Sequence, residues 1–218
     1  MKLRMFCIFV TATVLAGCRN NNKAASIEKL EDTTPVQDAR ILKESFRQED
    51  TISPGKQTDS LAVIRANFKR INSISNWTVI DTTDLWESTE GGEARFYYSN
   101  GRLEKIIAQL LGETYQQLIE YYLLDGKLSF VFEKTLRYNR PIYYDSAATK
   151  ASEDTEAFDI KKSTVMESRN YFKNEKLIYQ VHTPAVDPAE GEDHLLTEEE
   201  RIKTAFKKLI GPGKAGSH

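Results

Sequence analysis

Three stretches of the chain repeat one six-residue pattern: Tyr98-Ser99-Asn100-Gly101-Arg102-Leu103, Leu123-Leu124-Asp125-Gly126-Lys127-Leu128 and Phe172-Lys173-Asn174-Glu175-Lys176-Leu177. In each, an apolar residue is followed by any residue, then Asn or Asp, Gly or Glu, Lys or Arg, and Leu. Asn-Gly and Asp-Gly between apolar residues indicate a two-residue type I′ hairpin turn, in which both central residues need positive φ. The pattern therefore predicts three tight hairpins. The third is the least favourable, because Glu175 occupies a position with positive φ, which glycine adopts at a lower energetic cost.

The turns also predict the first cross-strand pair of each hairpin: Tyr98 with Leu103, Leu123 with Leu128, and Phe172 with Leu177. The three copies begin 25 and then 49 residues apart, close to one and two periods of a repeating hairpin. This spacing predicts an antiparallel meander, interrupted by a polar loop at 146–159. Its strands are expected at residues 77–86, 94–98, 103–111, 115–123, 128–138, 164–172 and 177–182.

One amphipathic helix is predicted before this sheet in the sequence and another after it. The first follows Asp59 or Ser60 as N-cap. The second follows a capping box from Thr197 to Glu200 and is ended by Gly211 and Pro212. We therefore predict an α+β domain, an antiparallel β-meander of about six or seven strands with both helices packed on one face. The side chains expected between the helices and that face are Leu61, Ile64, Phe68, Ile202, Phe206 and Leu209.

The N-terminus has the features of an export signal, because Lys2 and Arg4 precede an apolar run from Met5 to Leu15. The run is too short to span a bilayer, which needs about 20 apolar residues. It ends in Leu15-Ala16-Gly17-Cys18, which resembles the lipobox of bacterial lipoproteins. The resemblance implies that the chain is cut before Cys18 and that the Cys18 thiol carries a diacylglycerol. The alternative is an ordinary signal peptide cut after Gly17, with a chance cysteine.

The resemblance predicts a signal peptide at 1–17, and composition and periodicity predict a flexible tether at 18–55, a single domain at 56–211 and a disordered tail at 212–218. A flexible tether of this length reaches roughly 35 Å. No aspartate lies directly next to Cys18, which in the lipoprotein sorting rules favours the outer membrane, and no acidic run follows it, which argues against display on the cell surface. The domain is therefore expected to face the periplasm. The lipid bilayer is an expected partner, since two acyl chains on Cys18 would attach the protein to the membrane almost permanently.

Composition narrows the possible functions. Removing Lys2 and Arg4 with the signal leaves 28 basic against 32 acidic residues, a net charge of −4. A mildly acidic net charge does not indicate the basic surface that binds the phosphates of nucleic acids. The two cysteines are Cys7, lost with the signal, and Cys18, so no internal disulfide is expected.

Signals for catalytic or metal chemistry are weak. The histidines His182, His194 and His218 are scattered and lack zinc-ligand spacing. No nucleophile elbow, Walker loop or dinucleotide fingerprint is present in the sequence. Acidic residues cluster at 145–159 and 187–200, and either loop could offer oxygen ligands to calcium, but neither has the spacing of a known calcium loop. We therefore expect no metal, no cofactor and solvated loop charges.

Tyrosines and phenylalanines are the distinctive enrichment, and the doublets Tyr97-Tyr98 and Tyr121-Tyr122 must point to opposite faces of their strands. The expected registers place Tyr97 opposite Glu104 and Tyr122 opposite Ser129, with Tyr121 opposite Phe130. Tyr97 and Tyr122 are therefore predicted to be exposed and to bind an envelope protein or a glycan. The alternative is that cross-strand aromatic pairs only stabilise the sheet.

Two classes of function follow from these features. The favoured one is a non-enzymatic, membrane-anchored envelope lipoprotein that serves as a binding or interaction module. The other is an envelope hydrolase acting on glycan or peptide, which would need carboxylates that converge in a pocket.

Overall fold

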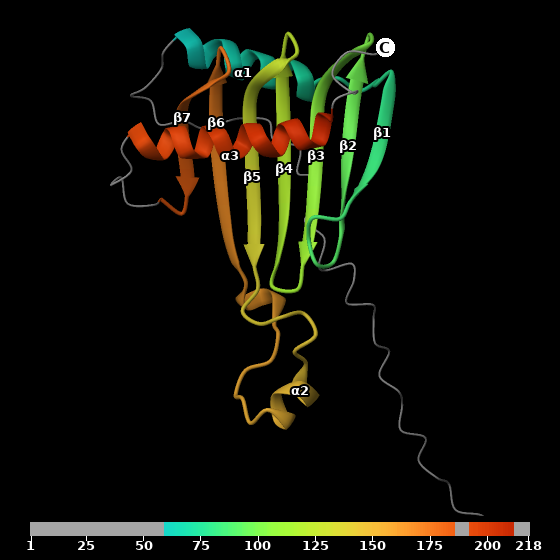
Figure 1. The fold of residues 1–218 in the computed structure, drawn as a ribbon, viewed down its shortest axis with the longest axis vertical. Helices are drawn as coiled ribbons and strands as arrows, with labels where there is room; N and C mark the ends of the chain where they lie inside the picture. Colours follow the sequence, from blue (N-terminus) through green and yellow to red (C-terminus); the bar gives the residue numbers. More distant parts are fainter. Residues whose placement is uncertain (1–58, 186–191, 212–218) are drawn as a thin grey trace, which may run out of the picture. The chain divides into compact units, whose positions relative to one another are not determined.

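A computed structural model describes residues 59–185 and 192–211 of the chain. The signal peptide, the tether and the tail expected at 1–17, 18–55 and 212–218 lie outside the described residues. Within them, one seven-stranded antiparallel sheet has its strands in sequence order, with a helix before it and another after it (Figure 1). The helices are α1 (Asp59–Asn72), α2 (Ser146–Ala151) and α3 (Glu192–Ile210). The strands are β1 (Val79–Leu85), β2 (Gly92–Ser99), β3 (Arg102–Gly112), β4 (Tyr115–Leu124), β5 (Lys127–Arg137), β6 (Thr164–Lys173) and β7 (Lys176–Thr183).

The three repeated stretches form the predicted hairpins. Their central pairs have positive φ in every copy: 51° and 73° at Asn100 and Gly101, 50° and 75° at Asp125 and Gly126, and 51° and 62° at Asn174 and Glu175. The expected first pairs, Tyr98 with Leu103, Leu123 with Leu128 and Phe172 with Leu177, are confirmed. Glu175 thus adopts the left-handed backbone that glycine adopts in the other two turns.

Each hairpin then carries the same irregularity, one step after its first pair. The register shifts so that Glu104, Ser129 and Ile178 have no direct partner, which is the signature of a β-bulge. Tyr97 consequently lies opposite Lys105, Tyr122 opposite Phe130, and Tyr121 opposite Val131. The predicted pairs of Tyr97 with Glu104, Tyr122 with Ser129 and Tyr121 with Phe130 are wrong because the extra residue displaces the partner strand by one position.

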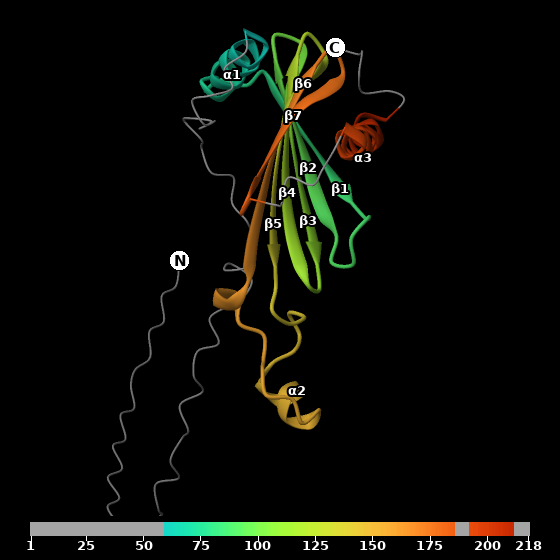
Figure 2. The ribbon, with the colours of Figure 1, turned by 90° about the vertical axis from the view of Figure 1, so that its left-hand side faces the viewer.

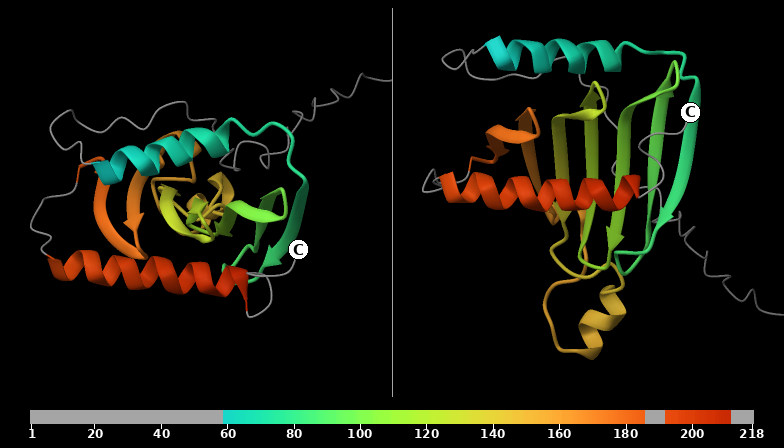
Figure 3. Two further views of the ribbon diagram at one scale, coloured as in Figure 1. Left: turned by 90° about the horizontal axis from the view of Figure 1, so that it is seen from above. Right: turned by 45° about the horizontal axis from the view of Figure 1, so that its top comes forward.

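The two helices pack on opposite faces of the sheet, so the prediction that they share one face is wrong (Figures 2 and 3). Leu61, Ile64 and Phe68 of α1 pack with Tyr122, on what we call the α1 face. Ile202 and Phe206 of α3 pack with Tyr121, on what we call the α3 face. The physical reason is that the aromatic doublets make both faces of the sheet apolar near the hairpins, and each face needs its own cover. The expected core residues are buried, except Leu209, which is only half-buried.

Helix α3 begins at Glu192, five residues before the predicted cap. Thr197 lies inside the helix, where its hydroxyl donates to the carbonyl of Asp193 at 2.9 Å. The capping box is therefore not formed. The helix extends further because Leu195 packs against the same apolar cluster as Ile202 and Phe206.

Candidate functional site beneath helix α3

Tyr97 and Tyr122 are not exposed, contrary to the sequence-based expectation. Their exposed fractions are 6% and 1%. The ring of Tyr97 lies 5.2 Å from that of Trp77, and the ring of Tyr122 lies 4.9 Å from that of Phe68. Helix α1 and the segment that follows it cover this face, so the two tyrosines pack inside the domain and do not form an open aromatic surface.

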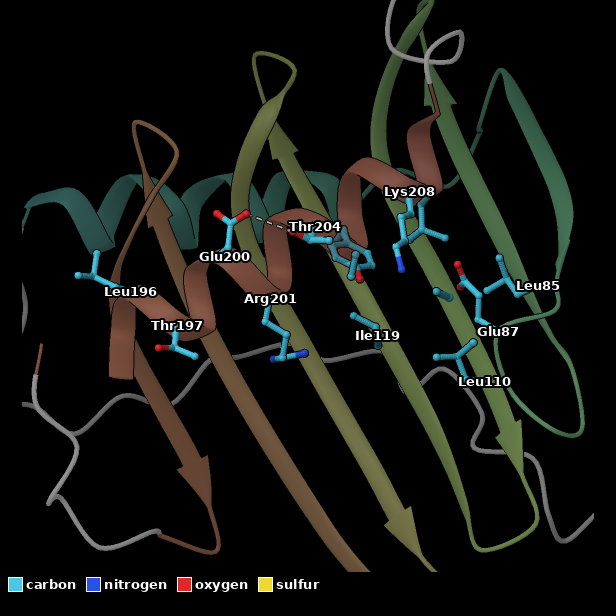
Figure 4. A pocket seen from close by; sticks show the side chains of 14 residues that line it. Leu85, Glu87, Leu110, Ile119, Leu196, Thr197, Glu200, Arg201, Thr204 and Lys208 are labelled. Atoms are coloured by element: carbon cyan, nitrogen blue, oxygen red, sulfur yellow. Dashed lines mark hydrogen bonds between the residues drawn. The ribbon is translucent and has the colours of Figure 1, made fainter. Parts of the chain in front are cut away.

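The other face holds a groove of about 790 Å³ between α3 and the sheet (Figure 4). Strands β3 and β4 form its floor, the end of β1 closes one side, and α3 lies above it. The volume is within the range of small-ligand and peptide-anchor sites, roughly 300 to 1,000 Å³. The groove was not predicted from the sequence, because it depends on where α3 crosses the sheet.

The floor of the groove is aliphatic. Ala108 on β3 pairs with Ile119 on β4. Leu110, two residues after Ala108 on β3, and Tyr121, two residues after Ile119 on β4, lie on the same face of the sheet. Ala205 and Leu209 of α3 face them from above, and Leu85 adds a side wall. Strand alternation and the helical repeat thus bring aliphatic side chains from four elements, β1, β3, β4 and α3, to one cavity.

Arg201 forms the polar boundary of this groove. Its guanidinium donates two parallel hydrogen bonds to the Glu133 carboxylate on β5, at 3.0 and 2.7 Å. It also donates to Glu198, one turn earlier on α3, at 2.8 to 3.1 Å. Asn170 continues the network by donating to Glu133 at 3.2 Å and accepting from Gln180 at 2.6 Å. This network ties α3 to strands β5, β6 and β7.

The ionisation of these groups follows from their surroundings. Burial alone would lower the pKa of Arg201, but hydrogen bonds and charge from Glu133 and Glu198 outweigh it and raise the pKa above its usual range. Burial would raise the pKa of Glu198, but Arg201 outweighs it and the pKa lies below its usual value. Burial, and then the charge of Glu133, raise the pKa of Tyr121 well above the usual value. At neutral pH, Arg201 and Glu198 are therefore charged and Tyr121 is protonated.

This arrangement is poorly suited to acid–base catalysis. Arg201 keeps Glu198 ionised and Tyr121 keeps its proton, so neither of these two groups is poised to exchange a proton near neutral pH. The remaining carboxylates of the groove, Glu87 and Glu200, are exposed. Glu200 accepts a hydrogen bond from Thr204 at 3.3 Å, drawn in Figure 4.

Metal-ligand geometry is also absent from the described part of the chain, where no group of three or more His, Cys, Asp or Glu side chains is placed to hold an ion. His182 and His194 lie 6.4 Å apart between ring centroids, and His194 Nε2 contacts Gln180 Oε1 at 3.2 Å. His218 lies outside the described residues.

The acidic residues of the 145–159 loop have structural partners. Asp145 caps α2, Asp159 caps a short 3-10 helix at Ile160–Lys162, and Asp154 pairs with Arg140 at 2.9 Å. The second acidic loop falls partly on residues 186–191, which are outside the described ranges. The described acidic loop therefore uses these carboxylates to hold its own backbone.

Comparison with protein-family models, with curated proteins and with solved structures finds no match to this chain. Within residues 59–185 and 192–211, no helix is both long and apolar enough to cross a membrane. The groove, its aliphatic floor and the Arg201 network are therefore the features from which a function can be argued.

Proposed function

We propose that this chain is a lipid-anchored lipoprotein of the bacterial envelope that acts as a non-enzymatic binding module. The groove beneath α3 binds an apolar element of an envelope partner protein. The resemblance of Leu15 to Cys18 to a lipobox supports the anchor, and the absence of an acidic signal after Cys18 supports an outer-membrane position facing the periplasm. The observation that carries the binding role is the aliphatic lining of the 790 Å³ groove.

A protein partner is favoured over a glycan by the chemistry of the lining. Sugar rings stack on exposed aromatic faces, whereas the lining residues are mainly aliphatic, threonine or charged. The aromatic residue in the lining, Tyr121, is 2% exposed, and its ring packs 5.7 Å from that of Phe206. Aliphatic side chains of a partner would replace water from Leu85, Leu110 and Ile119 at a gain of roughly 25 cal/mol per Å² buried.

Binding is also favoured over hydrolysis, the alternative function. A glycoside hydrolase needs one carboxyl group that donates a proton beside a second that is ionised. Glu133 and Glu198 instead share Arg201 as a common partner. Both carboxyl groups are therefore engaged with Arg201, which favours a structural over a catalytic role for them.

The binding role is tested by photo-crosslinking in intact cells. A photoreactive amino acid at Thr204, an exposed position in the groove lining, should give a discrete protein adduct. The same amino acid at Ala151, an exposed position at the end of α2, should not. Ala205→Trp should fill the groove and remove the Thr204 adduct, while Ala151→Trp should leave it. Equal adducts from both positions, or none from Thr204, would refute the groove as the binding site.

The anchor is tested separately by mass spectrometry of the membrane-extracted protein. A mature chain that begins at an acylated Cys18 is expected, and Cys18→Ser should release the protein or leave it unprocessed. A soluble, unmodified wild-type chain would contradict the lipoprotein assignment.

A further inference from the structure

The charges around the groove and its aliphatic floor identify the kind of segment that fits it. We infer that the groove takes a basic amphipathic segment of the partner, with its apolar side on the aliphatic floor and its Lys or Arg side chains on the acidic rim. This inference rests on the proposed binding function and adds the chemistry of the partner to it.

Carboxylates outnumber cations at the groove. Glu87 and Glu200 line it, and Glu133 and Glu198 lie behind Arg201. The lining itself thus holds two carboxylates and two cations, Arg201 and Lys208, and with Glu133 and Glu198 the total is four carboxylates against two cations, a net charge of −2. Because Arg201 is already bound on both sides by Glu133 and Glu198, its charge is not available to a ligand. The groove is therefore net acidic, and a basic ligand is its electrostatic complement.

Lys208 does not reverse this balance. In Figure 4, its side chain extends toward the same end of the groove as Glu87, so that end holds one charge of each sign. Glu200 lies further along α3, on the side of the groove away from Glu87. An anionic amphiphile would thus meet the exposed Glu200 carboxylate at one rim and a balanced pair of charges at the other, whereas a basic one would be attracted to Glu200.

A peptide is favoured over a lipid by this combination. A fatty acid or an anionic phospholipid would bring negative charge to an acidic rim. An amphipathic helix laid in a groove presents apolar side chains at positions i, i+3, i+4 and i+7 and charged ones beside them. That pattern matches an aliphatic floor bordered by Glu87 on one side and Glu200 on the other.

The test uses the full mature chain with Cys18→Ser and three defined probes, measured by calorimetry. The probes are an amphipathic peptide of leucine and lysine about 14 residues long, roughly 21 Å as a helix, its counterpart with glutamate in place of lysine, and laurate. The leucine–lysine peptide should bind with one-to-one stoichiometry, about tenfold or more tighter than the other two. Its affinity should fall as salt rises from about 0.05 to about 0.5 M.

Matched variants separate charge from packing. Glu87→Lys with Glu200→Lys should weaken the leucine–lysine peptide about tenfold and strengthen the leucine–glutamate peptide. Glu153→Lys with Glu175→Lys makes the same change in net charge at exposed positions outside the groove and should alter neither affinity by more than about twofold. Ala205→Trp, which fills the groove, should abolish binding of the leucine–lysine peptide.

The outcomes distinguish this inference from the proposed function. If both peptides bind equally and Ala205→Trp abolishes both, the groove binds protein but the basic preference is wrong. If laurate binds and neither peptide does, the occupant is an aliphatic lipid and the inference is overturned. If the protein dimerises and Ala205→Trp makes it monomeric, the occupant is a second copy and the inference is again overturned. If no probe binds and Thr204 gives no crosslink in cells, the proposed function itself fails.

Discussion

Replacing Arg201 by methionine should destabilise the domain by about 3 kcal/mol. The Glu133 side chain is 7% exposed, and the change removes the two hydrogen bonds, at 3.0 and 2.7 Å, that Arg201 donates to its carboxylate. Leaving a buried charge without its partner typically costs about 3 to 5 kcal/mol. The lower end applies because the Arg201 side chain is 45% exposed and water can reach part of the site. Asn170, which donates to Glu133 at 3.2 Å, is retained and limits the loss further.

A double-mutant cycle in denaturant unfolding measures this interaction. Arg201→Met and Glu133→Met together remove both charges, so the double variant should lie within about 1 kcal/mol of the wild type. Arg201→Lys keeps the charge but loses the planar fork, and an intermediate cost of about 1 kcal/mol is expected. A cost below about 1 kcal/mol for Arg201→Met, or a double variant as unstable as the single one, would refute the view that this pair holds α3 to β5.

Three further predictions concern stability. Phe206→Ala should cost about 3 to 5 kcal/mol, because the ring is 8% exposed and packs against Tyr121; a loss below about 1 kcal/mol in denaturant unfolding would mean that α3 is not docked. Glu175→Gly should stabilise the domain by about 0.5 to 1 kcal/mol because it relieves a φ of +62°. Gly126→Ala, at a φ of +75° with open space around it, should destabilise the domain by about 1 kcal/mol. A destabilising Glu175→Gly or a stabilising Gly126→Ala in thermal unfolding would contradict the turn assignment. Because the pKa of Glu198 is lowered in the folded state, its contribution to stability is complete above its unfolded pKa of about 4.5 and is lost as pH falls through the folded value. Glu198→Gln should therefore make the stability of the domain less dependent on pH in the acidic range. An unchanged pH dependence would contradict the ion pair between Glu198 and Arg201.

Local turn chemistry explains why the hairpins could be predicted. A type I′ turn is specified by its own central residues, so Asn100 and Gly101 are sufficient to locate the first turn and its first pair. The bulges could not be predicted, because the extra residues Glu104, Ser129 and Ile178 share no chemical type. Each bulge shifts the partner strand by one residue, which is why the prediction failed from the second pair onward.

The face of the sheet on which each helix packs could not be predicted from the sequence. A stripe such as Leu61, Ile64 and Phe68 shows that a helix has one apolar side, but not which face of the sheet it meets. Doublets such as Tyr121-Tyr122 make both faces apolar and so are compatible with either choice. The error for Tyr122 follows directly, since its burial depends on α1 covering that face.

The groove depends on contacts between residues that are distant in sequence. Arg201 and Glu133 are separated by 68 positions, and neither belongs to a recognisable motif. The aliphatic stripe of α3 was identified from its spacing, but the cavity between Ala205 and Leu110 arises from the angle at which α3 crosses the strands. Strand alternation does predict that Ala108 and Leu110 share one face, but it does not show that a helix leaves space above them.

The most direct test of the account is methyl NMR of the protein with the leucine–lysine peptide bound, since it reports which face of the sheet the ligand contacts. The account predicts contacts from peptide leucines to the methyl groups of Leu85, Leu110 and Ile119 on the α3 face, and unchanged signals from Leu61 and Ile64 beneath α1. Peptide contacts to the α1 face, or a complex that leaves Leu110 and Ile119 unperturbed, would contradict the claim that the groove beneath α3 is the binding site.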